Sequence, residues 1–110
     1  GDLLRTKGPN ADPSWARVVQ CTVAGDGTLQ ADSYGVTSIT KGGTGIYTVN
    51  FSSNFLNANF VAIVTVQDPT NAYIATINTP AVGSIGIRIF LHDNTLTNVP
   101  FLFLAMGDPA

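Results

Sequence analysis

The sequence predicts an all-β protein: an antiparallel β-sandwich, jelly-roll-like, with about seven or eight strands. Three observations lead to this fold class. Charged residues make up only 11% of the 110 residues and glutamate is absent, whereas Thr, Val, Ile, Asn and Gly abound, so helix is disfavoured. Short apolar stretches alternate with turn signals rich in Gly, Pro, Asn and Asp. The hydrophobic content of 45% is typical of a chain with a packed core.

The chain divides into two parts at residue 16. Residues 1–16 hold the only Trp and show no sustained hydrophobic period, so we expect an N-terminal arm or shaft linker there. Residues 17–110 are expected to form one β-sandwich domain. An arm stays ordered only where apolar side chains dock it, and Trp15 is the expected anchor.

Seven strands are predicted in order from the alternation of apolar and polar residues: Arg17–Ala24, Tyr34–Thr40, Ile46–Phe51, Phe60–Gln67, Ala72–Asn78, Ile85–His92 and Val99–Met106. The second and third are expected to form a hairpin through a Gly-rich loop. The fourth and fifth are expected to form another, because Asp68-Pro69-Thr70-Asn71 fits a type I turn.

Two of these strands are apolar on both faces. Val61 and Ile63 oppose the neighbouring apolar residues of their strand, and Leu102 and Leu104 oppose Phe101 and Phe103. Only one face of each sheet in a sandwich meets the core, so the second face needs another cover. The alternatives are the chain's own loops or another subunit. We favour another subunit, with an interface at Val61, Ile63, Leu102, Leu104 and Trp15.

Composition argues against several classes of function. The net charge of −2 and a pI near 4.8 leave no basic surface for nucleic acid. No apolar run reaches the roughly 18 residues that would span a bilayer, so membrane insertion is not expected. A single Cys and a single His rule out an internal disulfide framework and multi-histidine metal sites.

Catalytic patterns are also missing from the sequence. His92 and Asp93 are adjacent on a strand end, where neighbours point to opposite faces, so the acid is badly placed to orient the base. Cys21 could meet His92 across the fold, but a lone Cys in an apolar strand is more often a core residue. Calcium binding near Asp26 and Asp32 is a weak alternative, because the spacing is not that of an EF-hand. We therefore expect no enzyme, no catalytic residue, no metal and no cofactor.

Several segments resemble the distal parts of bacteriophage tail-fibre and virion fibre proteins. The chain opens with G-D-L-L and continues with P-S-W-A at Pro13–Ala16, two motifs that recur along fibre shafts. Its middle reads Y-G-V-T-S-I-T and then G-T-G-I-Y-T-V-N-F, similar to a block of those proteins. The segment Asn57–Val61 and a last strand that ends in Gly-Asp, Phe101–Asp108, continue the likeness.

This resemblance implies a homotrimeric structural protein of the virion surface, a distal domain of a tail or head fibre. It would attach to a host-surface glycan or protein and contact other virion proteins through its N-terminal side. Receptor-binding residues are expected on two loops: Asp68, Thr70, Asn71, Tyr73, His92, Asp93 and Asn94. The alternative is a lectin-like carbohydrate-binding module of a secreted bacterial protein.

Overall fold

The computed structural model describes residues 2–6 and 13–110, with side chains from residue 16 onward. Within these residues the chain forms eight strands: β1 (Asp2–Thr6), β2 (Pro13–Val23), β3 (Val36–Gly43), β4 (Ile46–Phe51), β5 (Val61–Val66), β6 (Tyr73–Ala81), β7 (Ser84–Leu91) and β8 (Phe101–Gly107).

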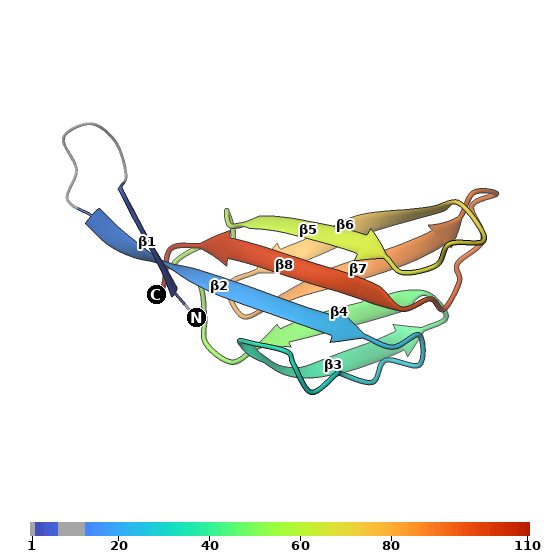
Figure 1. Cartoon of the computed structure of the whole chain (residues 1–110), viewed down its shortest axis with the longest axis horizontal. Coiled ribbons are helices and arrows are strands. Elements are labelled where there is room, and N and C mark those ends of the chain that lie inside the picture. The colour runs from blue at the N-terminus through green and yellow to red at the C-terminus, as the bar shows by residue number, and fades with distance from the viewer. Residues whose placement is uncertain (1, 7–12) are drawn as a thin grey trace.

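Two antiparallel sheets pack face to face, as Figure 1 shows. We call the sheet with strand order β1-β2-β8-β5 sheet A, and the sheet with order β3-β4-β7-β6 sheet B. The predicted antiparallel β-sandwich is therefore confirmed. The predicted strand Ile46–Phe51 coincides with β4, and its hairpin with β3 is confirmed as well.

The predicted hairpin between the fourth and fifth strands is wrong. β5 pairs with β8 in sheet A, whereas β6 pairs with β7 in sheet B, so residues 67–72 cross from one sheet to the other. The Asp68–Asn71 turn signal reverses the chain direction but carries no information on which strand becomes the hydrogen-bonded neighbour. Pairing with β8 places Val64 opposite Phe103 and Val66 opposite Phe101, toward the core.

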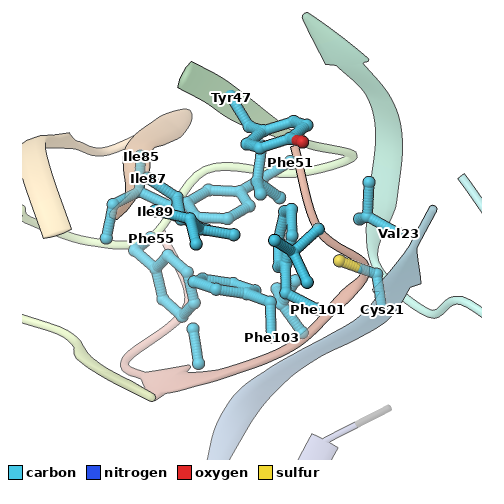
Figure 2. Packing of buried hydrophobic residues seen from close by; sticks show 14 residues of the cluster. Cys21, Val23, Tyr47, Phe51, Phe55, Ile85, Ile87, Ile89, Phe101 and Phe103 are labelled. Atoms are coloured by element: carbon cyan, nitrogen blue, oxygen red, sulfur yellow. The ribbon is translucent and has the colours of Figure 1, made fainter. Parts of the chain in front are cut away.

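The core lies between the sheets and is built from alternate residues of the inner strands. Figure 2 shows three isoleucines of β7 facing Phe101 and Phe103 of β8, with Tyr47 and Phe51 beside them. The Tyr47 and Phe101 rings meet edge to face, with centroids 4.9 Å apart. Cys21 is buried in the same cluster, which confirms its role as a small core residue.

Residues 2–6 and 13–17 form a two-stranded extension, because β1 pairs only with the first part of β2. Figure 1 shows this extension projecting beyond one end of the sandwich. The expected docking of Trp15 cannot be read from the backbone, since its side chain and residues 7–12 lie outside the described parts of the chain. It stays a prediction.

Candidate functional site

The two loops expected to bind a receptor lie side by side. β6 begins at Tyr73, directly opposite Leu91 where β7 ends, and the His92 N–H donates to the Ala72 carbonyl at 3.1 Å. Both loops therefore sit at the same end of the sandwich, which we call the distal end. Figure 1 shows it opposite the β1–β2 extension and the end of β8.

The distal end is fastened by a buried tyrosine. The Tyr47 hydroxyl donates to the Gly25 carbonyl at 2.7 Å, which joins sheet B to the loop after β2. Asn98 Oδ1 accepts from the Gly45 N–H at 2.8 Å and lies 3.4 Å from the same hydroxyl. Gly45 has a φ of +70°, and a Cβ there would stand 2.7 Å from the Ile89 carbonyl oxygen, so glycine is required. These contacts hold the loops on a rigid base.

The carboxylate of Asp68 is occupied by its own loop. One of its oxygens accepts from the Thr70 N–H at 2.8 Å and from the Thr70 hydroxyl, and the other accepts from the Tyr73 hydroxyl at 2.7 Å. These bonds, led by the one from the Thr70 hydroxyl, lower the pKa of Asp68. The same bond to Asp68 raises the pKa of Tyr73. At neutral pH the loop thus presents a fixed negative charge beside an aromatic ring.

Asp93 repeats this arrangement on the neighbouring loop. The Thr95 N–H donates to Asp93 Oδ1 at 3.1 Å, and the side-chain and backbone bonds from Thr95 lower the pKa of Asp93. Asn94 adopts a φ of 71° in the turn, and His92 is exposed. A third Asp-x-Thr turn forms at Asp26, whose Oδ1 accepts from the Thr28 N–H at 3.0 Å. All three aspartates therefore accept a hydrogen bond from the backbone of their own turn.

A cavity of about 300 Å³ lies where the 67–72 loop meets the free edges of β5 and β6. Asp68, Asn71 and Tyr73 line it together with residues of the two strands. The other expected receptor residues, Thr70, His92, Asp93 and Asn94, lie outside its lining. The structure thus gathers three of the seven residues around one hollow and leaves the rest on the adjacent surface.

The second candidate surface is the outer face of sheet A. Val61 is 66% exposed, Ile63 56%, Leu102 40% and Leu104 39%. The strand register places Ile63 directly opposite Leu104, so these side chains form one continuous apolar patch across β5 and β8. Their outward orientation agrees with the sequence prediction. No loop among the described residues buries them.

The sequence did not identify the polar border of this patch. A hollow of about 440 Å³ runs along it and is lined at one side by Gln20, Thr22 and Asp32. Gln20 lies opposite Leu104, and Thr22 lies opposite Leu102. The alternation of Gln20 and Thr22 with buried residues of β2 puts them on the outer face. Only the strand order reveals that they lie beside β8.

Metal-ligating side chains do not cluster in the part of the chain that the structure describes. No group of three or more His, Cys, Asp or Glu side chains gathers there. Burial raises the pKa of the Cys21 thiol to about 12, so it is a poor nucleophile. No helix that could cross a membrane is found among the described residues.

Comparisons with known proteins identify no relative. No protein family, curated protein or solved structure matches the chain. The class of protein that the fold and surfaces define is therefore a low-charge β-sandwich with an exposed apolar sheet face and polar loops at one end.

Proposed function

We propose that the chain is a structural protein of a phage virion: the distal domain of a tail or head fibre, which assembles as a homotrimer and attaches to the host surface. The observation that carries the proposal is the apolar outer face of sheet A. Monomeric proteins rarely expose such a face, and burial between copies removes it from water. The sequence resemblance to fibre proteins gives the class of assembly.

The trimer is formed through the four exposed residues of β5 and β8. Three copies related by a closed three-fold axis would bring these patches together around the axis. The four side chains carry no charge, so copies can approach without the cost of burying an unpaired ion. The low overall charge of −2 keeps long-range repulsion between copies small.

Attachment to the host uses the loops at the distal end, on the expected residues Asp68, Thr70, Asn71, Tyr73, His92, Asp93 and Asn94. The half-buried Tyr73 ring beside amide, carboxylate and hydroxyl groups suits a glycan, whose hydroxyls need both donors and acceptors. The β1–β2 extension at the opposite end faces the remaining virion proteins. Three copies of a weak loop site gain affinity through avidity.

Two measurements test this proposal. Light scattering of the parent should give the mass of three copies of the 11.5 kDa chain, or of a multiple of three, and the mass of Leu104→Lys should fall below that of three copies.

Labelled protein should adsorb to the host cells of candidate phages, and the triple variant Asn71→Ala, Tyr73→Ala, Asn94→Ala should lose adsorption while its mass stays unchanged. A monomeric parent refutes the trimer. Undiminished adsorption by the triple variant refutes the loop site.

The hollow beside Tyr73 favours a second candidate, a lectin-like module that binds a glycan as a single copy. Asp68, Asn71 and Tyr73 meet there in one chain, so this function needs no assembly. Glycan binding by Leu104→Lys at the affinity of the parent would support the lectin-like module. Binding that falls with the assembly would support the fibre.

A further inference from the structure

The four sheet edges of the sandwich are not equally protected. An open edge strand invites pairing with another chain, and proteins blunt such edges with charges, prolines, bulges or covering loops. β3 carries Lys41 and two irregularities of register. β6 carries Pro80 beside Thr79, which has a φ of 50°, at an irregularity of its pairing with β7.

The β2 side of sheet A is covered. β1 pairs with the first part of β2, and the segment 28–34 runs along the second part. Gln20 and Tyr34 exchange backbone hydrogen bonds at 2.9 and 2.7 Å, and the Gln30 N–H donates to the Thr22 carbonyl at 2.9 Å. Three of the four edges thus carry a device that disfavours pairing, or are covered.

β5 has no such device. Its sequence Val61–Val66, V-A-I-V-T-V, contains no charge and no proline, and its register with β8 is regular throughout. Among the described residues it pairs only with β8. Figure 1 shows β5 at the upper border of sheet A.

One hydrogen bond shows which residues of β5 point their backbone groups toward the free edge. The Gln67 N–H donates to the Pro100 carbonyl at 2.8 Å, so residue 67 points its backbone groups toward β8. Backbone direction alternates along an antiparallel strand. The N–H and C=O groups of Ala62, Val64 and Val66 therefore point away from β8, at the open edge.

We propose that β5 pairs antiparallel with β5 of a second copy, so that sheet A continues from one copy into the other. Val64 then lies opposite Val64 of the second copy, and Ala62 lies opposite its Val66. All three outward-pointing residues of each copy therefore form main-chain hydrogen bonds. Three hydrogen-bonded pairs give about six main-chain hydrogen bonds. Ile63 then lies beside Thr65 of the second copy on the outer face.

A second copy fits this edge for two reasons. The outward residues Ala62, Val64 and Val66 are evenly spaced about Val64, so a two-fold axis at Val64 gives each of them a partner. The six residues carry no charge, so two copies meet without repulsion. The contact is two-fold and involves an edge, so it does not rest on the three-fold face contact proposed above. Trimers that also pair through β5 would run as hexamers.

Two alanines make a matched test. Ala62 on β5 and Ala75 on β6 are both half-buried against the core. Because the His92 N–H donates to the Ala72 carbonyl, Ala72 points its backbone groups toward β7. Backbone direction alternates along the strand, so Ala75 points its N–H away from β7, at the open edge. Proline at either position removes an outward donor and keeps the bonds within the sheet.

The experiment measures mass by sedimentation in the Leu104→Lys background, which weakens the face contact. The background variant should be a dimer, Ala62→Pro should reduce it to a monomer, and Ala75→Pro should leave the dimer intact. A monomeric background, or equal masses for the two proline variants, overturns the edge contact. The mass of the parent separately tests the trimer.

A cross-link tests the same contact without proline. Ile63 and Thr65 of the second copy form a non-hydrogen-bonded pair, with Cα atoms about 4.5 Å apart, within reach of a disulfide. A mixture of Ile63→Cys and Thr65→Cys should give a covalent dimer under oxidation, well above either variant alone. Cys21 is buried and does not compete. No gain in the mixture, or a stronger band from one variant alone, refutes the proposed register.

Discussion

The two outer faces of the sandwich differ sharply although both sheets share one core. On sheet A the outer face of β5 and β8 carries four exposed apolar side chains, Val61, Ile63, Leu102 and Leu104. On sheet B the outer face is mostly polar, and Asn50 Nδ2 donates to Ser38 Oγ at 3.1 Å and to Thr40 Oγ1 at 2.9 Å. Arg88 is exposed there between Ile46 and Thr76.

This difference separates the residues that fold the chain from those that we propose for contacts between copies. A polar outer face is the ordinary solution for an antiparallel sheet with one side in water. Sheet B mostly follows that rule. Its apolar exceptions are Ile74, which is 50% exposed, and the half-buried Phe90 and Ile46. Sheet A departs from it at four positions and also ends in an unprotected strand. Both departures point to contacts between copies on the same sheet.

The largest expected effect lies in the shared core. Phe101 is fully buried and contacts Tyr47 of the opposite sheet, so Phe101→Ala should cost about 3–5 kcal/mol of unfolding free energy. Urea unfolding should remain one transition, because both sheets lose the same packing. A loss under about 1 kcal/mol, or two separate transitions, would show that the sheets do not share one core.

A smaller effect is expected where the two sheets are tied at the distal end. Tyr47→Phe leaves the Gly25 carbonyl without its 2.7 Å donor and should cost about 1–3 kcal/mol. Tyr73→Phe is the matched control, since its hydroxyl bonds to the Asp68 carboxylate of its own surface loop and joins no second sheet. Equal losses of stability for the two variants in urea unfolding would contradict a special role for Tyr47.

The smallest effect concerns the loop at Asp68 and depends on pH. The bond from the Thr70 side chain lowers the folded-state pKa of Asp68, so the ionised carboxylate stabilises the fold above its unfolded pKa. This contribution disappears as the pH falls through the lowered value. Asp68→Asn should therefore slightly lower the melting temperature near neutral pH, and this effect should shrink as the pH falls below about 4. The exposed Asp32→Asn is the control, and a larger effect in acid would contradict the sign.

The sequence predicted much of the fold because alternation reports directly which residues face the core. It placed β4 at its observed bounds, and it put Val61, Ile63, Leu102 and Leu104 on outer faces. It could not predict that β5 and β6 belong to different sheets, since strand partners are chosen by non-local packing.

The candidate sites were predictable only in part for the same reason. Turn chemistry identified the aspartates of the distal loops, but not that the His92 N–H joins those loops. The open edge of β5 follows from strand order, which no local pattern contains. For the same reason the sequence could not show that Lys41, Pro80 and the 28–34 segment protect the other edges, because it does not tell which strands lie at the edges.

The central claim is that sheet A, and not sheet B, holds the contacts between copies. Ile63 and Ile74 test it most directly, because both are exposed isoleucines on the outer face of an edge strand, one in each sheet. Light scattering should give the same assembly for the parent and for Ile74→Lys, and an assembly of fewer than three 11.5 kDa copies for Ile63→Lys. Equal masses for the two lysine variants would contradict the claim.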